Sequence, residues 1–153
     1  MTQATTNLLL RASAILWVIW GLVHMLAGVM TISRETGGAI AGIADAVDPA
    51  LLEMAYHPAA GAVINQHGFN LLWIGATTTI AAYYVWRAVP VAIFIAALVG
   101  GLADIGYFIF MDLGGFVNFI PGTLMTLVSS AAVILSFTAY FKSIRHQTNA
   151  QSG

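Results

Sequence analysis

The stretch VPVAIFIAALVGGLADIGYFIFM, residues 89–111, decides the fold class of this chain. It is apolar throughout except for one ionisable side chain, Asp104. A helix needs ~20 mostly apolar residues to cross the hydrocarbon core of a bilayer. Because unpaired backbone polar groups cannot face lipid, we expect this run to form a membrane-spanning helix. Pro90 suits the first turn of such a helix, where the backbone N–H has no helical partner.

Three further runs of the same kind are found at residues 12–32, 68–86 and 116–141. The first holds a single ionisable residue, His24, and the other two hold no charge. Pro121 falls in the first turns of the last run, where it either kinks or starts the helix. The first run is too long for a signal-peptide core and is expected to be retained. The chain is therefore predicted to be a single all-α membrane domain over residues 1–153, a four-transmembrane-helix bundle with up-down-up-down order.

The composition agrees with a protein that uses the lipid bilayer as its solvent. Hydrophobic residues make up 59% of the chain and charged residues only 7%, whereas a soluble domain carries roughly 25% charged residues. The net charge of -1 and the lack of a basic patch argue against a nucleic-acid partner. Because there is no cysteine, disulfides, thiolate nucleophiles, iron–sulfur clusters and thiolate-bound haem are excluded.

The charged residues predict an orientation for the four expected spans. One side carries four of the five basic residues and no acidic residue: Arg11, Arg87, Lys142 and Arg145. The other side carries Arg34 and the acidic residues Glu35, Asp45, Asp48, Glu53 and Asp112. By the positive-inside rule both termini are expected in the cytoplasm, most simply across a bacterial cytoplasmic (inner) membrane.

A long outer loop, residues 33–67, joins the first two expected spans. Its segment Gly37 to Gly42 is expected to be flexible. Pro49 to Tyr56 is predicted to be a short interfacial helix, with Asp48 as its cap and Pro49 at its first position. The last residues, 147–153, form a polar tail that we expect to be disordered.

Polar residues gather in the outer half of the expected bundle. With a rise of ~1.5 Å per residue, His24 lies roughly 12 Å and Asp104 roughly 10 Å below the outer end of their spans. Asn70 and Asn118 lie only about 3–5 Å deep, and His67 is shallower. An intramembrane aspartate is costly unless it is paired, neutral or wetted, and is by default a functional hypothesis. No span holds a lysine or arginine, so His24 is the only ionisable partner at the depth of Asp104.

Each expected span also carries small or polar residues on one side, which favours packing between helices. The residues that align are Ala92, Ala96, Gly100 and Asp104 in one span; Trp20, His24 and Gly28 in another; His67, Asn70, Ile74, Thr77, Ala81 and Tyr84 in a third; and Asn118, Gly122, Met125 and Ser129 in the last. Packing alone explains such stripes, and a His24–Asp104 pair that only fixes helix register is a structural alternative to a functional one.

The functional hypothesis is a site that binds or converts a small lipophilic molecule in the outer half of the bundle. His24 and Asp104 would supply acid–base groups. Polar atoms of the ligand would be oriented by Asn70, Asn118, His67 and Tyr107, and apolar walls would come from Trp20 and Trp73. Whether the site is enzymatic stays open. The alternatives are a homo-oligomer or accessory subunit of a larger membrane complex, and a small transporter or proton pathway.

No particular cofactor is predicted. Retinal requires a lysine for its Schiff base, and no span holds one. Haem held by two histidines is disfavoured because His24 and His67 differ in depth. The histidine and acidic residues of the outer loop follow no known metal-ligand spacing, so no metal site is predicted.

Overall fold

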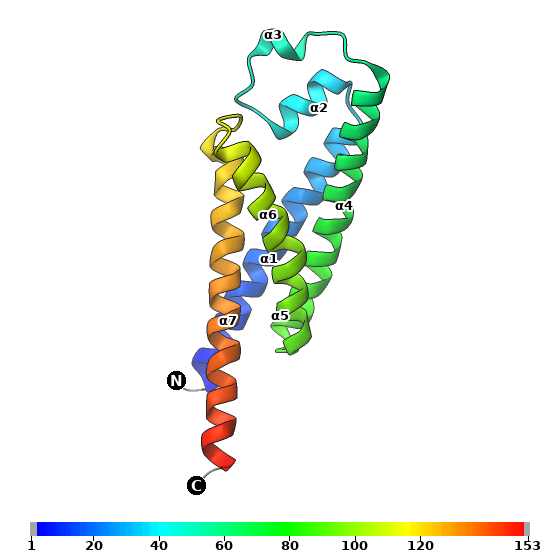
Figure 1. Cartoon of the computed structure of the whole chain (residues 1–153). Helices are drawn as coiled ribbons and strands as arrows, with labels where there is room; N and C mark the ends of the chain where they lie inside the picture. Colours follow the sequence, from blue (N-terminus) through cyan, green and yellow to red (C-terminus); the bar gives the residue numbers. More distant parts are fainter. Residues whose placement is uncertain (1–2, 152–153) are drawn as a thin grey trace.

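The computed structural model describes the backbone of residues 3–151 and the side chains of residues 3–144, and this part of the chain is helical with no strand. Figure 1 shows long helical segments that run side by side, with both chain ends at one end of the molecule and two short helices at the other. We call these the terminal end and the loop end. The long segments are α1 (Gln3–Ile32), α4 (Pro58–Trp86), the continuous segment from Pro90 to Asp112, and α7 (Leu124–Gln151).

The segment from Pro90 to Asp112 is not a regular α-helix. Its α-helical pieces, α5 (Pro90–Ala96) and α6 (Leu102–Tyr107), alternate with two π-helical pieces, η1 (Ala97–Gly101) and η2 (Phe108–Asp112). A further π-helical turn, η3 (Phe119–Thr123), precedes α7 and contains Pro121. The fourth expected run therefore starts irregularly, and its regular helix begins only at Leu124.

Among the described residues, three helices are long and apolar enough to cross a membrane: Gln3–Ile32, Pro90–Asp112 and Phe119–Ile144. They correspond to the first, third and fourth runs expected from the sequence. The second expected run lies inside α4, which has 29 residues but is less apolar. Asn65, Gln66, Asn70 and the threonines Thr77–Thr79 lower the hydropathy of α4.

The helices extend beyond the apolar runs that predicted them, because hydropathy marks only the part of a helix that suits lipid. α1 begins at Gln3 instead of residue 12, and α4 begins at Pro58 instead of residue 68. His57 caps α4 by accepting the N–H of Ala59 at 3.2 Å. The backbone of α7 continues to Gln151, through most of the region where a disordered tail was expected, and residues 152–153 lie outside the described residues.

The loop between α1 and α4 contains two short helices. The expectation of a flexible segment at Gly37 to Gly42 was wrong, because α2 (Thr36–Ile43) covers it. Gly37 of α2 is a packing residue, because a side chain at this position would collide with the carbonyl of Leu52. The helix expected from Pro49 is present as α3 (Pro49–Leu52), capped by Asp48, which accepts the Ala50 N–H at 2.9 Å. α3 ends at Leu52 and so is shorter than expected.

α1 and α4 pack antiparallel with their backbones in contact, at two pairs of glycines. A Cβ built on Gly28 would lie 2.5 Å from the carbonyl oxygen of Gly68, and one built on Gly75 would lie 2.5 Å from that of Gly21. In both helices the glycines are seven residues apart, which is about two turns, so they share one side. α4 therefore packs on α1 through Gly68 and Gly75, which the expected stripe did not include, whereas Ala81 and Ile74 of that stripe pack in the second buried cluster.

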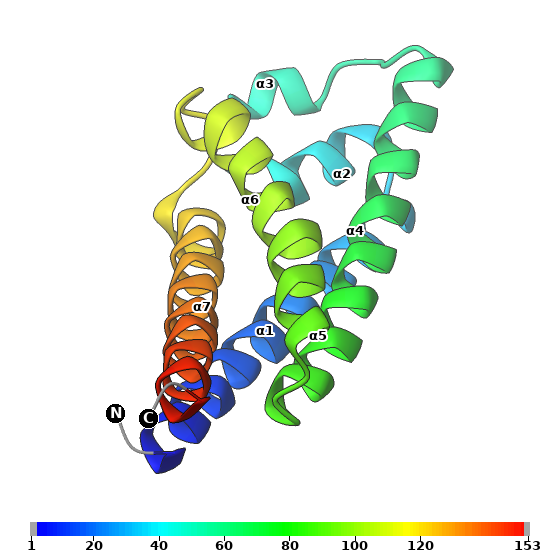
Figure 2. The same ribbon diagram turned by 60° about the horizontal axis from the view of Figure 1, so that its bottom comes forward.

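Buried side chains fill the terminal end and the middle of the molecule. One cluster consists of Leu10, Ala14, Val85, Ala92, Ile93 and Ala139, and the next consists of Trp17, Trp20, Ala81, Ala82, Ala96 and Ala132. The many alanines let the helices approach closely, as is usual when lipid surrounds a bundle. Towards the loop end α4 and α6 diverge (Figures 1 and 2), and a cavity lies between them.

Candidate functional site

The cavity at the loop end has a volume of about 410 Å³. α1, α4, α6 and α7 surround it, and α2 contributes Gly42 and Ile43. Most of its lining is apolar, including Val23, Leu71, Ile74, Phe110 and Met125. The polar side chains in the lining are His24, His67, Asn70, Asp104 and Tyr107, all of which the sequence had singled out.

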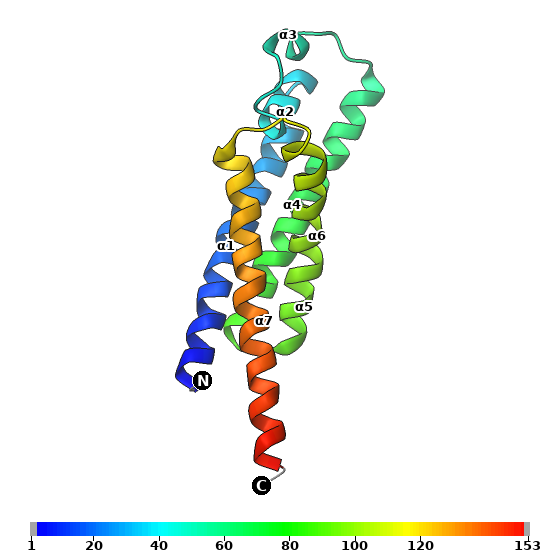
Figure 3. The ribbon, with the colours of Figure 1, turned by 60° about the vertical axis from the view of Figure 1, so that its left-hand side comes forward.

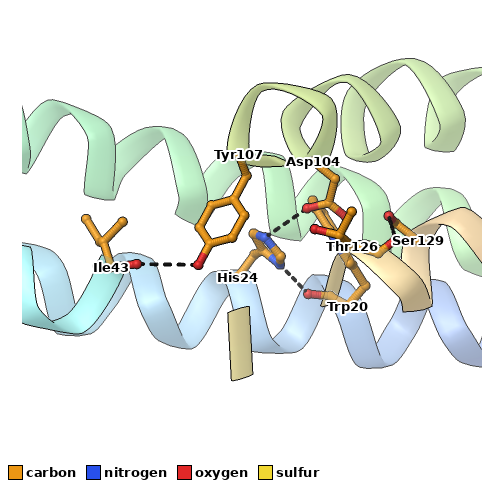
Figure 4. Close-up of polar contacts among 7 residues, drawn as sticks. All are labelled: Trp20, His24, Ile43, Asp104, Tyr107, Thr126 and Ser129. Atoms are coloured by element: carbon orange, nitrogen blue, oxygen red, sulfur yellow. Dashed lines mark hydrogen bonds and ion pairs between the residues drawn. The ribbon is translucent and has the colours of Figure 1, made fainter. Parts of the chain in front are cut away.

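His24 of α1 and Asp104 of α6 lie in the cavity wall and face each other (Figure 4). His24 Nε2 lies 3.8 Å from Asp104 Oδ1, a distance suited to an ion pair but too long for a direct hydrogen bond. Asp104 is only 3% exposed. The sequence left open whether these two residues meet, and the structure brings them to ion-pair distance.

Trp20, one turn before His24 on α1, holds both members of this pair. Its indole N–H donates to Asp104 Oδ2 at 2.7 Å. Its ring stacks on the His24 imidazole, with 3.6 Å between centroids and 21° between planes. Its backbone carbonyl lies 2.8 Å from His24 Nδ1. Trp20 is thus a positioning residue rather than the apolar cavity wall that was expected, and it is fully buried.

These contacts assign the protons of the pair. The Trp20 carbonyl can only accept, so His24 Nδ1 carries a proton. The Trp20 N–H already occupies Asp104 Oδ2. What remains is one imidazole nitrogen, Nε2, opposite one carboxyl oxygen, Oδ1, and a proton between them can reside on either. The pair can therefore give a proton to a bound molecule or take one from it.

Two hydroxyl residues of α7 lie on the other side of the Asp104 carboxyl (Figure 4). Ser129 is buried, and its hydroxyl donates to the Thr126 carbonyl at 3.0 Å. The hydroxyl oxygen of Thr126 is buried and has no hydrogen-bond partner among the described residues. The sequence placed Ser129 and Thr126 on the small-residue side of the last span but gave no sign that they would flank Asp104.

Two further predicted residues, Tyr107 and Asn70, line the cavity from opposite walls. Tyr107 extends from α6 towards α2, where its hydroxyl lies 3.5 Å from the carbonyl of Ile43 (Figure 4). Asn70 belongs to α4, and its side-chain carbonyl accepts the indole N–H of Trp73 at 3.1 Å. Trp73 is 44% exposed and does not line the cavity, so it supports Asn70 instead of forming a wall.

Asn118, like Trp20 and Trp73, is a predicted ligand-binding residue that lies outside the cavity lining. Its backbone N–H donates to the Asp45 carboxylate at 2.7 Å, and its side-chain amide donates to the Asp45 carbonyl at 3.3 Å. Asn118 is the residue before η3. It therefore ties the connection before α7 to the loop that follows α2.

Irregular helix brackets the cavity in a way that the sequence did not reveal. α6, which carries Asp104 and Tyr107, has a π-helical piece on each side, and η3 supplies Pro121 and Gly122 to the lining. Wide turns of this kind are rare and are often found at functional sites. Gly42 and Ile43 were also missed, because a glycine-rich segment had suggested flexibility. No group of three or more metal-ligating side chains occurs in the described residues.

Comparisons with protein-family models, with curated proteins and with solved structures find no match to this chain.

Proposed function

We propose that this chain is a four-span integral membrane protein that binds a small lipophilic molecule in the cavity between α1, α4, α6 and α7. The His24–Asp104 pair is its proton-exchanging group. The observation that carries the proposal is an ionisable pair, with a buried aspartate and a partly buried histidine, in the wall of a mostly apolar cavity and positioned by Trp20. Intramembrane ionisable residues are expensive and mark functional sites by default.

The fourth crossing is that of α4. α4 packs antiparallel on α1 through the glycine contacts, and α1 is among the helices apolar enough to cross a membrane. A helix with its backbone against a spanning helix shares that helix's depth in the bilayer. Two of its polar residues are kept away from lipid: Asn70 lines the cavity, and Thr78 is buried in the protein interior. The basic residues near the terminal end then favour cytoplasmic termini, as in a bacterial inner-membrane protein.

The chemistry that suits the pair is proton transfer to or from an oxygen, or from a carbon next to a carbonyl group. Neither step needs a cysteine or a lysine, which no expected span contains. The surrounding apolar side chains exclude water, so a proton on the pair exchanges with the bound molecule in preference to solvent. Binding and conversion are therefore two uses of one site, and conversion would require a substrate with an acidic proton or a basic oxygen.

Native mass spectrometry of the protein purified from its own membranes tests the proposal. We expect the wild-type chain to retain a small-molecule adduct. The variants Asp104→Asn and His24→Gln should lose it, because each removes the exchangeable proton while keeping a polar side chain of similar size. Ser136→Ala is the matched control: it removes a buried hydroxyl bonded to the Ala132 carbonyl, on α7 outside the cavity lining, and should retain the adduct.

Each variant is first checked for monodispersity and helical content, so that loss of the adduct is read only from folded protein. A wild-type protein without any small-molecule adduct would refute the proposal, as would equal retention by Asp104→Asn and His24→Gln. A fixed protein partner in the same spectra, with no adduct, would instead support the accessory-subunit alternative.

A further inference from the structure

The cavity is covered at the loop end. Gly42 and Ile43 of α2 form part of its lining, and Ala39 of α2 is 1% exposed. Two hydrogen bonds hold the chain just after α2 to the connection that precedes η3. Asp45 accepts the backbone N–H of Asn118 at 2.7 Å, and the Ala46 N–H donates to the Phe116 carbonyl at 3.0 Å. A molecule coming straight from the aqueous phase at this end would have to displace this segment.

The side of the cavity between α4 and α6 is built differently. α4 lies against α5 and η1 near the terminal end, and Figure 2 shows α4 and α6 drawing apart towards the loop end, with α2 between them above. Gly106 of α6 lines the cavity, and a Cβ built on it meets no atom within 4 Å. Phe110, one turn further along, also lines the cavity and is 73% exposed. The cavity is therefore open on a flank of the bundle that faces lipid when the helices span a bilayer.

The charges in the lining restrict the head group that fits. The lining contains no lysine or arginine, and its ionisable side chains are His24, His67, Asp104 and Tyr107. An anionic head would face the Asp104 carboxyl with no fixed cation to balance it. A cationic head could pair only with Asp104 Oδ1, because the Trp20 N–H occupies Oδ2, and this pairing would remove the proton shared with His24. Burial of an unbalanced charge in such a cavity is costly, so an uncharged head is favoured.

The separation of the His24–Asp104 pair indicates what an uncharged head must carry. The two facing atoms are 3.8 Å apart, and a single oxygen can lie at a hydrogen-bonding distance of about 2.8 Å from both. A hydroxyl can donate to one of them and accept the shared proton from the other. A carbonyl oxygen can accept that proton.

Building on the proposed function, we infer that the ligand is an uncharged amphiphile with a hydroxyl or carbonyl head, and that it enters sideways from the bilayer. Its head lies at His24 and Asp104. Its apolar tail leaves between α4 and α6, past Gly106 and Phe110. The segment formed by α2 keeps water from the head group while the flank admits lipid-soluble molecules.

Three photoreactive probes that differ only in head-group charge test this inference. They are a C16 fatty alcohol, a C16 fatty acid and a C16 alkylamine, each with a diazirine in the middle of the chain. Each probe is added to delipidated wild-type protein in detergent at a pH where the acid and the amine are charged. We expect the alcohol to be retained about tenfold better than the other two, a difference of about 1.4 kcal/mol. After photolysis, cross-links should map to α4 and to α6 or η2.

A matched pair of variants tests the flank itself. Gly106→Phe fills the opening and should reduce retention of the alcohol about tenfold. Ile105→Phe adds an aromatic ring at the adjacent residue, which is 55% exposed and outside the lining, and should leave retention unchanged. If Gly106→Phe fails to fold, the cross-link map of the wild-type chain still decides the route.

Equal or better retention of the acid or the amine would overturn the uncharged head. Cross-links on α2 or α3, or full retention by folded Gly106→Phe, would overturn the sideways route. In these cases an endogenous adduct that is lost in Asp104→Asn would leave the proposed function standing. If the wild-type chain holds no endogenous adduct, the proposed function fails and this inference fails with it.

Discussion

At the scale of single residues, Trp20 positions both ionisable residues of the candidate site. One indole donates a hydrogen bond to Asp104 Oδ2, stacks on His24, and belongs to a residue whose carbonyl fixes the His24 tautomer. The two contacts with His24 follow from the spacing of four residues between Trp20 and His24 on α1, which places both side chains on one side of the helix. Without the indole N–H, Asp104 Oδ2 would lose the hydrogen bond that it accepts from Trp20.

Replacement of Trp20 by Phe should therefore destabilise the protein. The change keeps an aromatic ring against His24 but leaves a buried carboxyl oxygen unsatisfied, at a cost of about 1–3 kcal/mol. Thermal unfolding in detergent, compared with the wild-type chain at the same detergent concentration, measures the loss.

Trp17→Phe is the natural control for this prediction. Trp17 is as fully buried as Trp20, but its indole nitrogen has no hydrogen-bond partner among the described residues. Its replacement therefore removes ring atoms without breaking a hydrogen bond, and should be much less damaging. Equal losses in the two variants would mean that ring volume, not the bond to Asp104, stabilises this region.

At the scale of elements, the pairing of α1 with α4 depends on glycine. The carbonyl of Gly21 lies against Gly75, and that of Gly68 lies against Gly28, so the helices touch backbone to backbone. Gly28→Ala and Gly75→Ala would each place a methyl group within 2.5 Å of a carbonyl oxygen that cannot rotate away. We expect each variant to lose about 1–3 kcal/mol, the usual cost of overpacking.

The control for the glycine variants is Gly101→Ala, in the third helical segment. A Cβ built on Gly101 would lie 3.7 Å from the side chain of Val133, which is ordinary van der Waals contact. Alanine is also a better helix former than glycine, so this variant should be neutral or stabilised by up to about 1 kcal/mol. Unfolding measurements on the three variants check the prediction, and a similar loss at Gly101 would show that the damage is not specific to the α1–α4 contact.

The elements also show what sequence reasoning can and cannot reach. A helix has a fixed rise, so counting residues brought His24 and Asp104 to one depth, and the structure places them 3.8 Å apart. On α4 the expected stripe included Ile74 and Ala81, which pack in the second buried cluster, but it missed Gly68 and Gly75, where the backbone of α1 touches α4. α2 was missed because its glycines, which are packing residues or surface residues of a helix, resemble those of a flexible loop. The π-helical turns around α6 have no simple sequence signature.

At the scale of the whole molecule, the polar and apolar parts of the bundle are separated along its length. Alanine-rich clusters close the terminal end and the middle, and the cavity with its ionisable pair lies towards the loop end. This separation depends on α4, which is close to α5 at one end and apart from α6 at the other. Figure 3 shows the short helices of the loop end lying across the top of the long ones. The site can then face the lipid only if α4 crosses the membrane with α1.

The crossing of α4 predicts on which side of the membrane each connection lies. The chain has no cysteine, so a single introduced cysteine reports its own position. Ala50→Cys lies on exposed α3 at the loop end, and Ala88→Cys lies in the exposed turn after α4. Ala88 has a positive φ of 58°, but alanine and cysteine both carry a Cβ, so the exchange adds no new backbone strain.

A membrane-impermeant maleimide should label Ala50→Cys in intact cells and should label Ala88→Cys only after permeabilisation. Gln3→Cys, at the start of α1, should behave like Ala88→Cys, because α1 and α4 would cross in opposite directions. If Ala88→Cys is labelled from outside while Gln3→Cys is protected, α4 does not cross the bilayer. The flank between α4 and α6 would then face water at the membrane surface, and the sideways entry of a lipid-soluble ligand would lose its physical basis.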